Sequence, residues 1–293
     1  MEIMEYLDQK DIEFCEAEQT AYTESCNALM RCANYIEWLE DVSEVYASEV
    51  NPKKFWEQLV NAHEIFYSRI AGYFEKKYHL EFSRELIKGD VMPENPDSGF
   101  TSFDNFNATE WLEKSKKYTE AVRSLRLDYK DIVQSLINQI GGETFQDYAY
   151  KTLLNRVRDA LWCYRKATPV FSVRGNKLIL SSDGGFCGGR DHYYAGDTRY
   201  KITESGRAVF EALAYYETGL FNNTGYFTEI CDPWELEESE FEYSADDRKV
   251  SHVKLYKNGR IDIKFKTKEY ADEFIKEFGE PDLTMKICNS RIA

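Results

Sequence analysis

The sequence predicts an α+β protein with a helical N-terminal region and a smaller C-terminal region of antiparallel hairpins and helices. Three observations lead to this fold class. Apolar residues recur at spacings of three and four through the first half of the 293-residue chain. After Lys166 the pattern changes to short β-rich segments. An Asn-Gly pair at 258–259 then joins two alternating segments, which is typical of a hairpin. We expect a helical region at 1–165, an α+β region at 166–280 and a tail at 281–293.

Two apolar rows predict a long first helix with a wide apolar face. One row is Tyr22, Cys26, Leu29, Ala33 and Ile36, and the other is Cys32, Tyr35, Leu39, Val42 and Tyr46. Asn51-Pro52 suits a helix start, so a second helix should continue through Ile70. Residues 88–107 contain two prolines and two glycines and predict a loop.

Later helices are predicted from their caps. Asn107 with Glu110 resembles a capping box, Gly141-Gly142 should end a helix, and Thr144 should open the next one. In the C-terminal region, Thr203 should cap a helix that ends at Gly219, and Thr267 should cap the last helix.

Two hairpins are expected in the C-terminal region. Residues 170–180 turn at Gly175-Asn176, and residues 253–265 turn at Asn258-Gly259, where we predict a type I′ turn. One face of the second hairpin should be buried, and the face with Lys254 and Lys264 should be wet. The glycine-rich residues 181–196 predict an irregular segment.

Negative charge is concentrated in two blocks. The chain has a net charge of −15; residues 1–50 carry thirteen acids and two bases, and residues 229–247 carry nine acids and no base, which leaves +5 for the remainder. Such blocks repel nucleic acid and anionic membranes and attract basic partners. We therefore expect a protein partner, with neither membrane binding nor direct nucleic-acid binding. Acidic faces that only keep the protein in solution are the alternative.

The cysteines and the N-terminus predict a cytoplasmic protein without a metal site. The seven cysteines have irregular spacing, with no CxxC pair and no zinc-ligand pattern. Residues 1–11 are acidic where a signal peptide needs bases, and no apolar run is long enough to span a bilayer. We expect mostly free thiols in a reducing compartment.

Three patterns were weighed as catalytic or ligand sites. Asp262 and Lys264 share one face of a strand, as the acid and lysine of metal-dependent nucleases do, with Asp232 as a second acid; an ordinary polar strand face is the alternative. The loop 183–192, with Arg190 and His192, could approach a phosphate, or could order against a partner. A Cys187–His192 nucleophile and base pair lacks fixed geometry. We predict no catalytic residue, metal or cofactor.

Two further segments predict contacts with proteins. Acidic and apolar side chains alternate in one, as suits a basic, partly apolar partner; a solvated loop is the alternative. Its residues are Trp234, Glu235, Glu237, Glu238, Glu240, Phe241 and Glu242. The tail carries Met285, Ile287 and Cys288, which we expect to contact a second subunit or the protein's own body.

The hairpin at 256–266, with the sequence YKNGRIDIKFK, resembles the signature of a phage and mobile-element domain family of unknown function. Arg260 and Asp262 replace the Asn and His that the family prefers, which argues against a catalytic role for that position. The chain is also similar in size, acidity and layout to viral inhibitors of the bacterial Gabija defence system. That resemblance implies a homo-oligomer that binds a bacterial defence complex and blocks its DNA binding and cleavage. The domain family also suggests an accessory module of a DNA-modifying methyltransferase.

Overall fold

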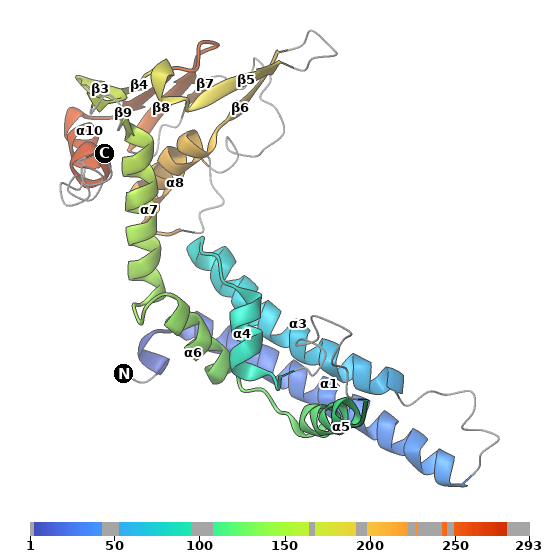
Figure 1. Ribbon diagram of the computed structural model, residues 1–293. Coiled ribbons are helices and arrows are strands. Elements are labelled where there is room, and N and C mark those ends of the chain that lie inside the picture. Colours follow the sequence, from blue (N-terminus) through green and yellow to red (C-terminus); the bar gives the residue numbers. More distant parts are fainter. Residues whose placement is uncertain are drawn as a thin grey trace, which may run out of the picture. The chain divides into compact units, whose positions relative to one another are not determined.

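The computed structural model describes residues 3–42, 53–94, 108–163, 168–191, 198–221, 227, 242–244 and 249–279. It confirms the predicted α+β class, with most helices in the N-terminal half and a five-stranded antiparallel sheet with helices in the C-terminal half (Figure 1). The chain forms two compact units, Met1–Phe145 and Gln146–Ala293. Among the described helices, none has the length and apolar character needed to cross a membrane.

The first unit is built around a pair of long helices. These are α1 (Gln9–Val42) and α3 (Lys53–Tyr78), which lie side by side and are preceded by the 3-10 turn Ile3–Glu5. Helix α6 (Tyr129–Gln139) packs on both of them and on α4 (Arg84–Val91), and α5 (Ala108–Ser124) packs on α3. Aromatic rings join them: Phe74 of α3 stacks on Phe145 with ring centroids 4.5 Å apart.

Helix α1 buries only one of its two predicted apolar rows. Tyr22, Cys26 and Ala33 are buried against α3 and its neighbours. In the second row, Tyr35 and Val42 are 59% and 61% exposed. The wide apolar face predicted for this helix is therefore only partly covered, since α3 and α6 supply its main contacts.

The helix ends follow the predicted caps, apart from the start of the loop. The backbone of Gly141 and Gly142 has positive φ (72° and 81°), which ends α6 as expected. Lys88 and Gly89 lie in α4, whose N-cap Ser83 accepts a hydrogen bond from the Leu86 amide, so the loop begins later than predicted. Asn51, Pro52, Asn107 and residues 95–107 lie outside the described residues.

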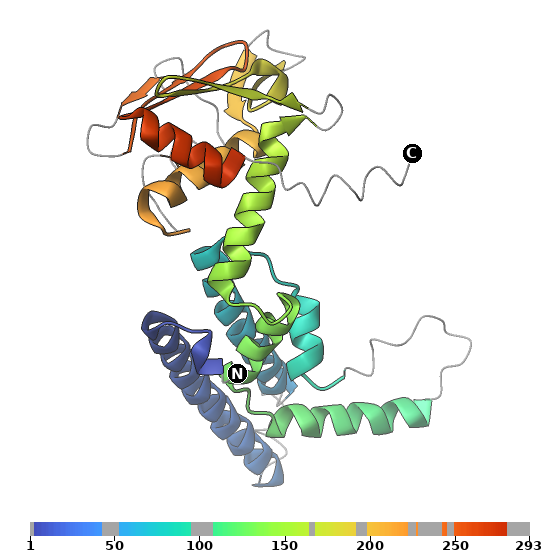
Figure 2. The same cartoon turned by 90° about the vertical axis from the view of Figure 1, so that its left-hand side faces the viewer.

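The second unit is a sheet with helices on one side. Its strand order is β3 (Phe171–Arg174), β4 (Lys177–Leu180), β9 (Ile261–Phe265), β8 (Val250–Leu255) and β7 (Glu242–Ser244). Helices α7 (Phe145–Leu161), α8 (Glu204–Thr218) and α10 (Lys268–Phe274), the last continued by the turn Ile275–Gly279, lie on the same side of it in both views (Figures 1 and 2). Short elements complete the unit: β1 (Trp162–Cys163), β2 (Thr168–Pro169), Ser182–Gly184, β5 (Cys187–Asp191) and β6 (Thr198–Ile202).

Strand alternation separates the two faces of the sheet. Leu178, Ile263 and Val253 form one cross-strand row on the inner face, and Leu180, Ile261 and Leu255 form the next. All six are buried in the core that α7, α8 and α10 complete. Val157 and Leu161 of α7 belong to that core. Helix α7 therefore packs with the second unit, although it precedes residue 165, where the sequence pattern changes.

Two local predictions needed correction. The turn between β8 and β9 has positive φ at Gly259 (84°) and not at Asn258, so it is not type I′. The Gly259 amide donates to the Tyr256 carbonyl, and the Tyr256 amide donates to the Arg260 carbonyl. These two bonds close a three-residue loop that ends in a left-handed glycine. The glycine-rich residues 187–191 are not irregular: they form β5, which pairs with β6 from Cys187–Ile202 to Asp191–Thr198.

Candidate functional site

The outer face of the sheet, opposite the three helices, gathers polar side chains into two cross-strand rows. The first row is Ser172, Ile179, Asp262, Lys254 and Glu242. The second row is Arg174, Lys177, Lys264, His252 and Ser244. These ten residues, with Tyr256 and Arg260 beside them, are called the open sheet face. It brings together Asp262, Lys264 and Glu242, which the sequence singled out for different reasons.

Asp262 is held by a clamp of basic and aromatic groups. Arg260 donates from Nε to Oδ1 at 2.7 Å and from its terminal nitrogen to Oδ2 at 2.8 Å, and the Tyr256 hydroxyl lies 3.3 Å from Oδ2. The Arg260 guanidinium stacks over the Tyr256 ring at 4.4 Å. Burial acts to raise the pKa of Asp262, but the hydrogen bonds and charge of Arg260 outweigh it and lower that pKa. The carboxylate is therefore ionised and already occupied.

Glu242, His252 and Ser244 form a second cluster at the β7 edge. His252 Nε2 lies 3.1 Å from a Glu242 oxygen, and His252 Nδ1 lies 3.0 Å from the Ser244 hydroxyl. Lys254 lies 3.4 Å from the same carboxylate. The two distances match the contacts of an acid, a base and a nucleophile. All three side chains are on neighbouring strands of the outer face, and Glu242 is shared with the lysine.

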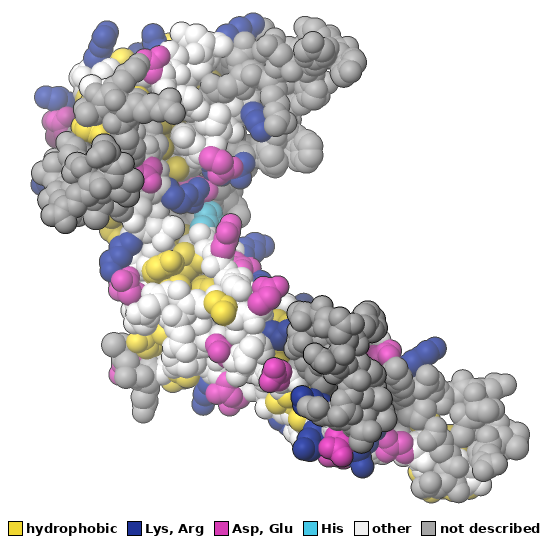
Figure 3. Space-filling model, in the orientation of Figure 1, with side chains coloured by type: hydrophobic (Ala, Val, Ile, Leu, Met, Phe, Trp, Pro, Cys, Tyr) yellow, Lys and Arg dark blue, Asp and Glu magenta, His cyan; other side chains and the backbone are white. Residues whose placement is uncertain are grey.

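Three cations of the second row have no ion-pair partner among the described residues. Lys177 is directly opposite both Arg174 and Lys264, and Lys264 is opposite His252. Arg174, Lys177 and Lys264 are exposed, and none of them forms an ion pair with a described residue. Blue side chains project along the margin of this unit above the sheet in Figure 3. The open sheet face is thus locally basic in a protein of net charge −15.

The donor set fits anion binding better than metal binding. The described residues contain no group of three His, Cys, Asp or Glu side chains that could hold a metal ion. In the first row Lys254 stands between Asp262 and Glu242, so the two carboxylates cannot share a cation without displacing an ammonium group. A metal at Asp262 would also have to compete with Arg260 for both oxygens.

Most of the other predicted site residues lie outside the described residues. These are Trp234, Glu235, Glu237, Glu238, Glu240, Phe241, Met285, Ile287, Cys288, His192 and Asp232. Glu242 begins β7 on the open sheet face. Arg190 and Cys187 lie in β5, opposite Arg199 and Ile202, so strand pairing replaces the predicted loop at these positions.

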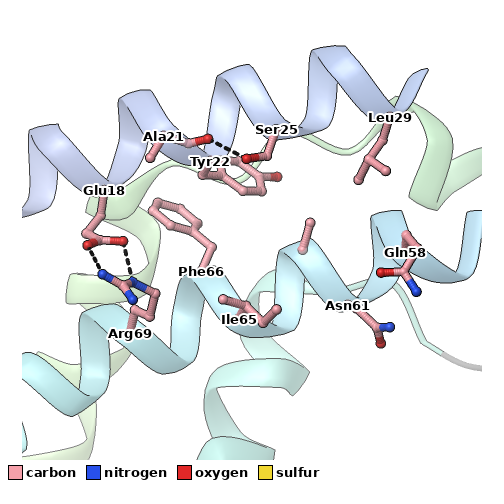
Figure 4. A pocket seen from close by; sticks show the side chains of 11 residues that line it. Glu18, Ala21, Tyr22, Ser25, Leu29, Gln58, Asn61, Ile65, Phe66 and Arg69 are labelled. Atoms are coloured by element: carbon pink, nitrogen blue, oxygen red, sulfur yellow. Dashed lines mark hydrogen bonds and ion pairs between the residues drawn. The ribbon is translucent and has the colours of Figure 1, made fainter. Parts of the chain in front are cut away.

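A groove lies between α1 and α3 of the first unit (Figure 4). It has a volume of about 360 Å³. Tyr22 and Phe66 lie between the helices, and the half-exposed Ile65 lines the α3 side. At one end Glu18 accepts two hydrogen bonds from Arg69, at 2.6 and 2.5 Å. Its walls are mainly apolar and its one charged pair is satisfied, so it can hold an apolar group but offers no catalytic chemistry.

The C-terminal part of α1 carries exposed aromatic residues. The Tyr35 and Trp38 rings lie 5.6 Å apart, and Trp38 is 53% exposed. Val42 continues this side of the helix, because residues three or four apart share a helix face. Exposed Trp and Tyr are typical of protein interfaces.

The sequence analysis missed the residues that make the face basic. Arg260 was treated as a departure from a family pattern, although an arginine two residues before a strand aspartate can clamp it. Arg174 and Lys177 were visible as the wet side of the first hairpin. The residues beside them in the sheet could not be predicted from the sequence, because β4 pairs with β9 across about eighty residues of chain.

Comparisons with protein-family models, curated proteins and solved structures found no match to this chain. The candidate site therefore rests on its own geometry. The resemblances to the phage domain family and to Gabija inhibitors stay predictions.

Proposed function

We propose that the protein acts by binding a macromolecule and that its partner is a bacterial anti-phage defence complex of the Gabija type. The contacts of Asp262 and Lys264 support a binding function over a nuclease function. Asp262 is saturated by Arg260 and Tyr256, and Lys264 faces a second lysine, so neither side chain is arranged for nuclease chemistry. The choice of partner follows from the sequence resemblance.

Several surfaces support a binding function. Trp38 and Tyr35 expose aromatic area on α1, the α1–α3 groove offers an apolar recess, and the segment 234–242 brings acidic and apolar residues together. A partner that binds DNA has a basic surface, which the acidic segment complements. Assembly as a homo-oligomer through Met285, Ile287 and Cys288 is part of the proposal.

Size-exclusion chromatography of the protein mixed with a purified Gabija complex tests the proposal. We expect co-elution, loss of DNA cleavage by the complex, and a mass above that of one chain for the protein alone. Replacing Glu235, Glu237, Glu238 and Glu240 by Gln should weaken the complex. The matched control replaces the exposed Glu81, Glu94, Glu113 and Glu120, which lie outside both acidic blocks, by Gln and should leave the complex intact. Absence of both co-elution and inhibition would contradict the choice of partner.

Nuclease activity is tested separately with plasmid DNA and Mg²⁺ or Mn²⁺. We expect no cleavage by the protein. Cleavage that Asp262→Asn abolishes and Glu242→Gln leaves unchanged would replace binding by catalysis as the function.

One observation favours a second candidate function, acyl hydrolysis through Ser244. His252 contacts both the Ser244 hydroxyl and Glu242, at 3.0 and 3.1 Å. In that reaction Ser244 Oγ adds to the acyl carbon of an ester while its proton passes to His252, and His252 gives that proton to the departing alcohol. Water then adds to the acyl group and gives a proton to His252, and the carboxylic acid leaves as Ser244 Oγ takes that proton back. Labelling by a fluorophosphonate probe, lost in Ser244→Ala but kept in Ser172→Ala, would support it. Absence of labelling would rule out the hydrolase, and binding would be the only proposed function.

A further inference from the structure

Positively charged side chains lie directly opposite one another on the open sheet face, which is electrostatically unfavourable. Lys177 stands directly opposite Arg174 on one neighbouring strand and Lys264 on the other. Like charges directly opposite each other destabilise a sheet. Lys177 helps to lower the pKa of Asp262 on the diagonal, but that carboxylate accepts its hydrogen bonds from Arg260 and Tyr256. The second row therefore presents positive charge that no described carboxylate neutralises.

The spacing of these cations suits an extended polyanion. Neighbouring strands lie about 4.8 Å apart, so the row from Arg174 across Lys177 and Lys264 to His252 extends over roughly 14 Å. Lys254 lies one row away, about 7 Å along the strands. The side chains stand side by side instead of converging on one point. A single small anion would meet only one or two of them, whereas a phosphate backbone would meet them all.

Net charge does not prevent such binding. Screening at 0.1 M salt confines electrostatic interactions between exposed charges to about 10 Å. A phosphate on the open sheet face would therefore respond to the row of cations beneath it more than to acidic residues elsewhere on the chain. The sequence-based expectation against nucleic acid came from charge summed along the chain. The acidic block at 229–247 reaches this face at Glu242, where Lys254 and His252 contact its carboxylate, and the sum does not describe the row of Arg174, Lys177 and Lys264.

Duplex nucleic acid fits this face better than single strands. Proteins that hold single strands stack the bases on free aromatic rings. Tyr256 is the one aromatic among the described residues of the open sheet face, and the Arg260 guanidinium covers its ring. Contacts to the backbone of a duplex need cations alone. We infer that the open sheet face binds the phosphate backbone of duplex DNA without sequence preference, an activity beyond the proposed function.

Fluorescence anisotropy with a labelled 20-base-pair duplex at several salt concentrations tests the inference. We expect saturable binding at low salt, equal for two unrelated sequences, with a slope of log K against log salt of about −3, since each phosphate contact contributes about −0.9. The double variant Lys177→Glu and Lys264→Glu should bind more than tenfold more weakly, with a shallower slope.

A matched control separates the face from net charge. Lys116→Glu with Lys117→Glu, exposed on α5 of the other unit, changes the charge of the chain equally and should leave duplex binding within about twofold. Circular dichroism checks that both double variants are folded. No saturable binding by the wild-type chain, or equal losses in the two double variants, would overturn the inference.

An acidic protein surface is the competing ligand class. Poly-glutamate of similar length, added as a competitor, should displace the duplex only at much higher concentration. The inference fails if the duplex does not bind and poly-glutamate does, with a salt dependence that the Lys177→Glu and Lys264→Glu changes reduce. In that case the open sheet face binds an acidic protein. Neither result changes the co-elution test of the proposed function.

Discussion

In the helical unit Asp11 lies buried beside Lys77 and Tyr78, whereas on the sheet Lys177 and Lys264 face each other across neighbouring strands. The helical unit pairs four of the thirteen acids in residues 1–50 with its own cations. Asp8 and Asp11 contact Lys77, Glu18 pairs with Arg69, and Glu37 pairs with Arg123. The sheet does the reverse and exposes cations in a row.

The difference separates charges that hold the fold from charges that are available to a ligand. A buried pair is strongly coupled to stability, because removing one partner leaves the other without compensation. An exposed row of like charges contributes nothing favourable to folding, so its removal should cost little stability. The acidic block at 1–50, which the sequence analysis offered as a docking surface, is to that extent part of the internal structure of its own unit.

The largest effect is expected from Asp11→Ala. Asp11 is buried and receives a hydrogen bond from Lys77 at 2.5 Å and another from Tyr78 at 3.1 Å. Its loss leaves the Tyr78 hydroxyl without this acceptor and leaves Lys77 with only the exposed Asp8. We expect a loss of about 3 kcal/mol in the free energy of unfolding, measured by urea denaturation. Asp8→Ala should cost only about 1 kcal/mol, because its side chain is 54% exposed and its main role is to accept the Asp11 amide hydrogen bond at the start of α1. Equal costs would show that burial does not set the difference.

Asp262→Asn tests the paired carboxylate of the sheet. The pKa of Asp262 is lowered in the folded protein, since Arg260 outweighs the effect of burial. The ionised carboxylate therefore stabilises the folded protein at pH values above 3.8, the ordinary pKa of the group. This stabilisation is lost as the pH falls through the pKa of the folded protein. We expect a loss of roughly 1–2 kcal/mol at pH 7, because Arg260 is partly solvated, and convergence with wild type in acid. A gap that does not shrink as the pH falls below 3.8 would contradict this account.

His63 gives the helical unit a pH response. It is buried between Tyr22, whose hydroxyl lies 2.8 Å from Nδ1, and the Val122 carbonyl. Burial lowers the pKa of His63 from 6.5, so protonation favours the unfolded chain and stability falls as the pH drops below 6.5. Urea denaturation at pH 7.0 and 5.5 should differ by about 1 kcal/mol from this group. His63→Gln should remove that difference, whereas His79→Gln should keep it.

The smallest effect on the free energy of unfolding is expected from Lys264→Glu. Whether this change raises or lowers stability tests the contrast between the two units. The new carboxylate would face Lys177 and His252, so a repulsive pair becomes attractive. We expect stability to rise by about 0.5 kcal/mol, while duplex binding weakens. Lys116→Glu on α5 should leave the free energy of unfolding nearly unchanged. A destabilised Lys264→Glu protein would mean that Lys264 supports the fold and that the contrast between the units is wrong.

Local sequence determined most of the elements. Caps at Ser83, Thr203 and Thr267, glycines with positive φ at 141, 142 and 219, and the alternation in 250–265 set helix ends and strands through interactions within a few residues. The signal of the glycine-rich residues 187–191 was misleading, because pairing with β6 overrides their weak local preference. For a related reason, the sequence did not show that Tyr35 and Val42 of α1 are exposed: periodicity shows which residues share a face, but not whether another helix covers it.

Only the tertiary structure decided where charge gathers. Net charge and acidic blocks are sums along the chain, whereas a ligand meets charges that are neighbours in space. Pairing of β4 with β9 brings Lys177 beside Lys264, and packing of α3 on α1 brings Lys77 to Asp11. Coulomb interactions depend on these separations and on burial. The same sequence therefore determines an acidic protein overall and, through its fold, a basic face on the sheet.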